Sequence, residues 1–362
     1  MSETTTAAPG RSKEQKGGWL RGALTSTNFS LIVAIIVLII VMTVLRPTTF
    51  LTVDNLLNIA VAAVLIGLCA LPQTLVILTG GIDISIGSIV GLTSVVAALI
   101  AAQSPSTGSG VLAIVVAIVV GAAAGTFNAV IITFGRVSPL IATLGTYTAY
   151  QGATYIVTQG KSTPVLNSTL NSVNSIQIAG IPLPVVLFVV AVVLFILFMR
   201  FTDFGRNIYA VGGNPTAARL AGLSVRRYLF GIYALVGVVG GLAGVILTAK
   251  QGAGVPDSGA PDLALASITA VVLGGASLVG GVGTILGTVL GVIILGVLDN
   301  GLLLLNVSAL YQPVPQGLLL IVAVLIQQWR GDLDIRQLFR ARTPVLAPTP
   351  AQEAAETEAP AR

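Results

Sequence analysis

The sequence predicts an all-α, polytopic membrane protein with about ten transmembrane helices, and three observations predict this class. Hydrophobic residues make up 55% of the 362 residues and charged residues only 9%, whereas soluble domains carry roughly a quarter charged residues. The apolar residues form long runs, and a spanning helix needs about 20 of them to cross a hydrocarbon layer roughly 30 Å thick. The lysines and arginines concentrate on alternate connections between these runs, as expected of loops that share one side of a membrane.

Ten apolar runs have the composition of membrane spans. In chain order they are Ser30–Leu45, Leu56–Thr79, Ile82–Ala102, Val111–Phe134, Leu140–Thr158, Leu183–Phe201, Leu229–Ala249, Leu263–Leu278, Thr284–Leu305 and Val314–Gln327. Polar, low-complexity segments flank them, so we expect disordered cytoplasmic tails over 1–28 and, for the most part, over 329–362. The transmembrane domain is then predicted over 29–328.

The basic residues predict the orientation of this domain. If the amino terminus is cytoplasmic, all of the 18 lysines and arginines lie inside except Arg46, Lys161 and Lys250. Excess Lys and Arg in cytoplasmic loops is the established orientation signal. Both termini are therefore predicted to be cytoplasmic, and the net charge of +5 reflects topology, without the basic stripe and interleaved aromatics of a nucleic-acid binder.

Several of the 41 glycines are spaced four residues apart in the predicted spans. The sets are Gly121 with Gly125, Gly237 with Gly241, and Gly283 with Gly287 and Gly291. Small residues at this spacing let helix backbones approach closely in a membrane. We interpret them as packing seams inside one bundle, in preference to a dedicated dimer interface.

The longest predicted cytoplasmic connection, over residues 202–228, contains the most specific local pattern. It runs TDFGRNIYAVGGNPTAARLAGLSVRRY. Asn214 is a favourable N-cap, Pro215 suits the first helical position, and Gly222 suits a left-handed stop. The sequence predicts a helix of about two turns along the membrane surface, framed by arginines. Such a basic segment either docks on another protein or binds anionic headgroups.

Asp83 is an acid within or beside a predicted span, where an ionisable group is costly and usually functional. In one interpretation Asp83, with Ser85 and Ser88, lies in a glycine-broken segment that borders a pathway or gate. In the other, Asp83 caps the following span by accepting amides of its first turn. The two interpretations are compatible, and the sequence leaves both open.

Other polar side chains inside spans are candidates to line a pathway for a polar solute, which requires hydroxyl, amide and aromatic groups on apolar walls. They are Asn58, Gln73, Asn128, Thr143, Thr146, Tyr147, Tyr150 and Gln151. The alternative is that these groups only bridge neighbouring helices or mark the membrane interface.

The composition argues against several chemistries. The chain has no histidine and only one cysteine, Cys69, which removes imidazole triads, thiolate metal sites and internal disulfides. Gly160–Ser162 mimics the end of a phosphate-binding loop, but the glycine required five residues earlier is Tyr155. We therefore expect no enzymatic activity, no metal and no nucleotide site in this chain.

Four stretches resemble the permeases of the ribose-transporter-like family of bacterial sugar ABC importers. They are TGGIDISIGS at Thr79–Ser88, SPLIATLGTYTAYQG at Ser138–Gly152, the connection around Phe204–Arg227, and Pro261–Gly301. The third meets the family pattern G-R-x-x-x-A-x-G-G-N-x-x-A-A-R-x-x-G. Family members commonly carry a carboxylate before the A-V-V-L-G-G stretch, where this chain has Ala264 and Ala266, with Asp262 the nearest acid.

The resemblance implies a type II ABC importer-like bundle in the bacterial inner membrane. It implies that the predicted short helix couples to separate ABC ATPase subunits, which bind ATP and Mg²⁺. The implied coupling residues are Gly205, Arg206, Gly212, Gly213, Asn214, Pro215, Ala217, Ala218, Arg219 and Gly222. Further implied partners are an extracytoplasmic sugar-binding protein and a second permease copy, identical or paired.

The solute class is not fixed by these motifs. A monosaccharide such as ribose, xylose or galactose is the first expectation. Related permeases carry an autoinducer, a nucleoside or a branched-chain amino acid, and an ion-coupled secondary transporter is a more distant alternative. Ion-coupled transporters place ionisable residues near the midplane, and the spans here contain almost none. A faint likeness between Leu71–Gly91 and Ser267–Gly287 reflects either an internal repeat or glycine bias.

Overall fold

A computed structural model describes residues 27–259 and 261–325, and the predicted tails lie outside this range except for the start of the first helix. The chain divides into two units, Met1–Ala323 and Val324–Arg362, and the fold described below belongs to the first. Its long helices follow the predicted spans. They are α2 (Thr27–Leu45), α3 (Val53–Leu78), α4 (Ser85–Ala101), α5 (Thr107–Thr133), α6 (Pro139–Thr158), α8 (Leu183–Phe201), α11 (Val225–Gln251), α12 (Asp262–Leu273) and α13 (Ile285–Leu304).

The all-α membrane class is confirmed. Within the described residues, six helices are long and apolar enough to cross a membrane: α2, α3, α5, α8, α11 and α13. Shorter apolar helices occupy Ser85–Ala101, Asp262–Leu273 and Pro313–Leu325, and α6 holds the polar candidates of the fifth predicted span. Every predicted span thus corresponds to a helix.

The eighth predicted span is wrong in length. Instead of continuing to Leu278, α12 ends at Leu273, and its 12 residues rise only about 18 Å, too short for a membrane roughly 30 Å thick. Gly275 stands at φ 88° and Gly280 at φ 98°, a left-handed region that glycine adopts at little cost. The chain therefore breaks inside what hydropathy alone presents as one run.

The third predicted span begins later than expected, at Ser85 instead of Ile82. The preceding residues Thr79–Ile84, here called the first break loop, turn at Gly80, which has φ 74°. Residues Gly274–Thr284 form a second break loop between α12 and α13. The two similar sequence stretches thus share one layout, helix, glycine turn, helix, which favours the internal-repeat interpretation.

The predicted glycine seams lie inside the bundle, between α5 and α11. A Cβ placed on Gly121 would lie 2.4 Å from the carbonyl oxygen of Gly237, and one on Gly125 would lie 2.6 Å from the Gly237 Cα. Close backbone approach of this kind is how small residues pack membrane helices. Gly283 departs from the prediction, because it stands at φ 151° before α13 begins and shares no helical face with Gly287.

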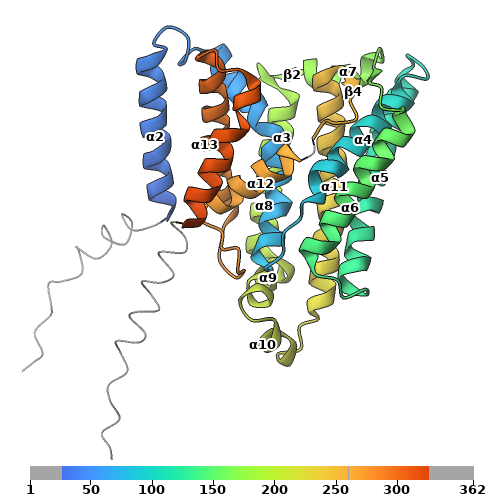
Figure 1. Ribbon diagram of the computed structural model, residues 1–362, viewed down its shortest axis with the longest axis vertical. Coiled ribbons are helices and arrows are strands. Elements are labelled where there is room, and N and C mark those ends of the chain that lie inside the picture. Colours follow the sequence, from blue (N-terminus) through green and yellow to red (C-terminus); the bar gives the residue numbers. More distant parts are fainter. Residues whose placement is uncertain (1–26, 260, 326–362) are drawn as a thin grey trace, which may run out of the picture. The chain divides into compact units, whose positions relative to one another are not determined.

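Small elements join the predicted outer loops. Strand β1 (Thr163–Pro164) pairs antiparallel with β4 (Ala253–Gly254), and β2 (Gln177–Ile178) pairs with β3 (Ile181–Pro182). Between them lies α7 (Ser168–Ser175), capped by Asn167. Within the first unit, Figure 1 shows β4 and α7 at one end of the bundle and two short helices, α9 and α10, at the other.

The end that carries α9 (Asp203–Gly213) and α10 (Pro215–Leu220) is where both break loops come together. The backbone amide of Gly281 donates to the carbonyl of Leu78 at 2.8 Å, which joins the second break loop to the end of α3. A short 3₁₀ turn, Ala309–Tyr311, precedes the helix Pro313–Leu325. The positions of α9 and the break loops define the candidate site.

Candidate functional site

Helix α10 is the short helix that the sequence predicts. The side-chain oxygen of Asn214 accepts from the amides of Thr216 at 3.1 Å and Ala217 at 3.0 Å, and Pro215 is the first helical residue. Gly222 has φ 83° just after the helix ends, so the left-handed stop is also present. Leu220 is 86% exposed, which makes this helix a protruding element with an apolar tip.

The residues before α10 form a helix that the sequence analysis left as a connection. Gly205, Arg206, Gly212 and Gly213 all lie in α9. Thr202 caps this helix by accepting from the amide of Gly205 at 3.0 Å, and Asp203 in the first turn suits the helix dipole. The threonine followed by an acid was the available signal, and the three glycines of α9, poor helix formers in water, concealed it.

Gly212 seats α9 against the bundle. A Cβ at this position would lie 1.7 Å from the carbonyl oxygen of Leu78 and 2.9 Å from the amide nitrogen of Gly281. No side chain fits in that space, so α9 rests with bare backbone on the end of α3 and on the second break loop. Gly213, the next residue, has nothing within 4 Å of its Cβ position.

Side-chain hydrogen bonds hold α9 in the same place. The Tyr209 hydroxyl donates to the carbonyl of Gly283 at 3.1 Å, and the Asn207 amide donates to the hydroxyl of Tyr228 in α11 at 2.8 Å. The ring of Phe204 packs on Tyr228 with centroids 4.7 Å apart. These contacts tie α9, the helix directly before α10, to the second break loop and to the start of α11.

Asp83 is buried at the start of α4, in a chain of polar contacts that joins three helices. Its carboxylate accepts from the amide of Ser85 at 2.8 Å and from the Ser85 hydroxyl at 2.6 Å. Asn128 of α5 donates to the Ser85 hydroxyl oxygen at 2.7 Å. Tyr150 of α6 donates to the carbonyl of Ala124 at 2.9 Å and lies 3.4 Å from the Asn128 amide oxygen.

Asp83 caps the first turn of α4 by accepting from the Ser85 amide, but other polar atoms around it have no hydrogen-bond partner among the described residues. Within the described part of the chain, the second carboxylate oxygen of Asp83 and the hydroxyl of Tyr233 are buried without a hydrogen-bond partner. A Cβ on Gly81 would lie 2.7 Å from the Tyr233 hydroxyl, so this hydroxyl borders the first break loop, to which Asp83 itself belongs. Buried unpaired polar groups are rare in proteins and call for a water, an ion or a moving partner.

The remaining pathway candidates divide by environment. Thr143 donates to the carbonyl of Ile82 at 3.2 Å and so contacts the first break loop, while the hydroxyls of Ser88 and Thr146 bond within their own helices. Gln73 is buried, and both ends of its amide lack a partner among the described residues. Asn58 is exposed on α3, away from the cluster, and Tyr147 and Gln151 are half-buried on α6.

A cavity of about 220 Å³ between α3, α11 and α12 is a feature that the sequence analysis did not single out. Asp262 and Gln316 give it two polar groups on a wall of leucine and isoleucine, and Gln316 also donates to Asp299 at 2.9 Å. Asp262 is the acid nearest to the position of the missing family carboxylate. Only the folded chain brings it beside Gln316, because the two residues lie on different helices.

A bundle of apolar helices, with two glycine-broken segments meeting at the end that carries the protruding helix α10, is typical of a multi-pass membrane permease. The chain belongs to the family of permease components described as the branched-chain amino acid transport system permease component, whose model matches residues 55–324. This membership and the apolar helices make it a multi-pass protein of the inner membrane.

Named relatives confirm the resemblance to ribose-transporter-like permeases. The ribose import permease of Bacillus subtilis is 41% identical over 81% of this chain and 90% of its own length. The L-arabinose ABC transporter permease of Azospirillum brasilense is 36% identical over 84% and 89%. An autoinducer 2 import permease of Photorhabdus laumondii is 33% identical over 88% and 98%. No solved structure matches the chain at a significant level.

Proposed function

We propose that this chain is the permease subunit of an ABC importer that carries a monosaccharide into the cytoplasm. Its relatives named for ribose and L-arabinose support the sugar. The observation that carries the mechanism is the seat of α9, where the Gly212 backbone lies against Leu78 and Gly281. In this proposal α10 docks on an ATPase subunit, and its movement is passed by α9 to both break loops.

This proposal requires three kinds of partner. Separate ATPase subunits bind ATP and Mg²⁺, an extracytoplasmic binding protein delivers the sugar, and a second permease copy completes the pathway. The chain itself performs no covalent chemistry. With α10 on the cytoplasmic side, both termini are cytoplasmic, in agreement with the excess of Lys and Arg in the predicted inner loops.

We further propose that the Asp83 cluster is part of the inner gate. Asp83, Ser85, Asn128 and Tyr150 join α4, α5 and α6 directly beside the first break loop. Because α9 rests on Leu78, at the end of the helix that leads directly into this loop, a shift of α9 changes the support of the cluster. The unpaired oxygen of Asp83 is then available to a group that arrives when the gate moves.

Uptake into proteoliposomes tests the class of transporter. The chain is reconstituted with and without its ABC ATPase subunits and sugar-binding protein, and entry of radiolabelled ribose is measured. The proposal expects uptake only with ATP and all components. Uptake by this chain alone, driven by an ion gradient, contradicts it.

Charge reversal on α10 tests the docking role. Arg219→Glu is expected to abolish ATP-dependent uptake while the protein still inserts and purifies as a single species, because Arg219 is exposed and contacts only Thr216 through its side chain at 3.2 Å among the described residues. Arg227→Glu, at another exposed arginine outside α10, is the matched control. Unchanged uptake by the Arg219 variant argues against docking through α10.

Autoinducer 2 is a second candidate substrate, because a relative bearing that name aligns over 98% of its length. Competition separates the two. Unlabelled ribose, autoinducer 2 or leucine is added to the labelled-ribose assay, and the compound that suppresses uptake at the lowest concentration identifies the solute. Strong suppression by autoinducer 2 with little by ribose replaces the sugar assignment.

A further inference from the structure

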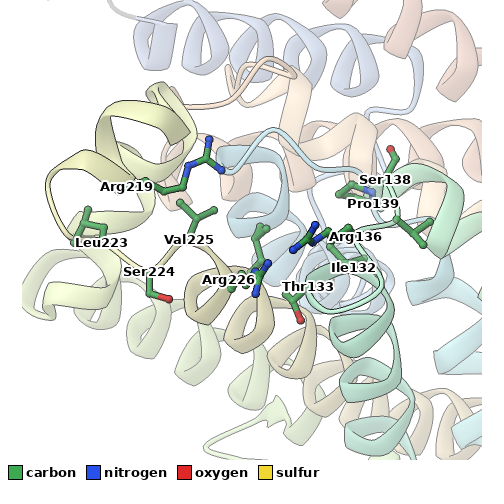
Figure 2. A pocket seen from close by; sticks show the side chains of 12 residues that line it. Ile132, Thr133, Arg136, Ser138, Pro139, Arg219, Leu223, Ser224, Val225 and Arg226 are labelled. Atoms are coloured by element: carbon green, nitrogen blue, oxygen red, sulfur yellow. The ribbon is translucent and has the colours of Figure 1, made fainter.

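A basic cavity opens where α5 ends and α11 begins, at the same end of the bundle as α10. Its volume is about 800 Å³. Figure 2 shows the side chains of Arg136 and Arg226 reaching into the space between these helices, with Arg219 of α10 farther along the rim. Of the three arginines that line this cavity, only Arg219 has a role in the proposed docking on the ATPase, so Arg136 and Arg226 have no assigned role.

The cavity carries positive charge without an internal counter-charge. Its lining contains three arginines and no acidic residue. The salt bridge found in the described structure joins Arg206 to Asp203, both outside this cavity, and the guanidinium groups of Arg136 and Arg226 have no hydrogen-bond partner among the described residues. Guanidinium groups that share a cavity repel one another, and a bound anion relieves that repulsion.

Two helix N-termini add to this positive field. Ser138 and Ser224 hold the N-cap positions of α6 and α11 on the cavity wall, and neither makes a side-chain capping hydrogen bond. Helix N-termini present unsatisfied amides and a partial positive charge of about half an elementary charge. Phosphate groups are favoured ligands at such ends.

Apolar side chains also line the cavity, among them Ile132, Val137 and Leu229. Directly beside it, Phe134 is 68% exposed at the end of α5 and Ile141 is 66% exposed on α6. A membrane protein leaves such side chains exposed toward acyl chains, so a ligand here has a charged end and an apolar end.

The geometry points to a binding site for an anionic phospholipid, whose phosphate lies between Arg136 and Arg226 and whose acyl chains run along the exposed face of α5 and α6. Basic pockets between spanning helices on the cytoplasmic side are a recognised form of lipid site. The bound lipid bridges the connection between α5 and α6 to the start of α11. This inference does not depend on which solute is transported.

Native mass spectrometry of the purified full-length chain tests the site. The protein is mixed with equal amounts of phosphatidylglycerol and phosphatidylcholine of identical acyl chains, and the retained lipid is counted. The wild type is expected to retain phosphatidylglycerol selectively. Each guanidinium near an anionic lipid contributes about fivefold, so Arg136→Gln with Arg226→Gln is expected to lower that selectivity about 25-fold.

Matched variants keep the test decisive. Arg227→Gln removes an exposed arginine that does not line the cavity and is expected to retain wild-type selectivity. Arg136→Lys with Arg226→Lys keeps the charge and is expected to retain most of it, and it replaces the glutamine variant if that one aggregates. Equal retention of both lipids by the wild type overturns the proposal, as does unchanged selectivity in the glutamine double variant.

Two further measurements test whether the cavity binds a free anion or a protein instead of a lipid. Inorganic phosphate, added at the lipid concentration, is expected to leave phosphatidylglycerol bound, because it lacks the apolar part. Displacement by phosphate shows a free-anion site and contradicts the lipid assignment. If the double variant keeps its lipid but loses affinity for the ATPase subunit, the cavity docks protein instead, and the proposal fails.

Discussion

Gly212 lies at the closest backbone contact between α9 and the rest of the bundle. The backbones of α9, α3 and the second break loop meet at its Cα, and the Cβ of any other residue would lie 1.7 Å from the Leu78 carbonyl oxygen. Gly212→Ala is therefore expected to displace α9, with an overpacking cost of about 1–3 kcal/mol and a loss of ATP-dependent uptake.

Its neighbour supplies the control for that prediction. Gly213→Ala adds the same methyl group on the same helix, but nothing lies within 4 Å of its Cβ position. Uptake and thermal unfolding of this variant are expected to match the wild type. Equal behaviour of the two alanine variants in both measurements contradicts the packing argument at Gly212.

Ser85 is the central residue of the buried polar chain. Its hydroxyl donates to Asp83 and accepts from Asn128, so Ser85→Ala leaves two buried polar groups short of a partner, at about 1–3 kcal/mol each. A lowered temperature of thermal unfolding in detergent is the expected result. Ser88→Ala, whose hydroxyl donates only to the Ser85 carbonyl in its own helix, is expected to change that temperature much less.

At the scale of elements, α10 depends on its cap. It has six residues, and a helix this short has little stability of its own. Asn214→Ala removes the two hydrogen bonds to Thr216 and Ala217 and is expected to cost about 1 kcal/mol. Faster hydrogen exchange over Pro215–Leu220 measures this loss.

The conservative replacement tests the mechanism of that effect. Aspartate is as good an N-cap as asparagine, so Asn214→Asp is expected to restore slow exchange over the same residues. If the alanine and aspartate variants exchange equally fast, the side-chain cap is not what holds α10.

Elements also show where hydropathy misleads. Leu263–Leu278 is apolar enough to be predicted as one span, yet α12 stops at Leu273 because the glycines that follow adopt left-handed backbone conformations. In α9 the opposite error occurs, because a helix was missed. Its glycines weaken a helix in water but allow close packing on other backbones here.

For the whole molecule, the predicted orientation is testable with single cysteines. The native Cys69 is buried, so the background is low. In right-side-out vesicles, Lys161→Cys is expected to react with a membrane-impermeant thiol reagent and Arg227→Cys to react only after the membrane is opened. The reverse pattern contradicts cytoplasmic termini.

The membrane helices, the glycine seams and the cap of α10 were predictable, because each depends on residues close together in the sequence. Apolar runs define membrane helices wherever they fold, and Asn214, Pro215 and Gly222 act within one short segment. The family motifs are likewise contiguous. All of these were present before any contact between distant segments was known.

The tertiary structure alone decided which of these segments meet. Leu78, Gly212 and Gly281 belong to three separate parts of the chain, and the same holds for Asp83, Asn128 and Tyr150. Among similar polar residues in a membrane bundle, no local pattern says which will face which, because pairing follows from helix packing and small residues allow many approaches. The sequence thus determined a membrane permease with a capped surface helix, and packing decided that the preceding helix, α9, rests on the end of α3 and on the second break loop.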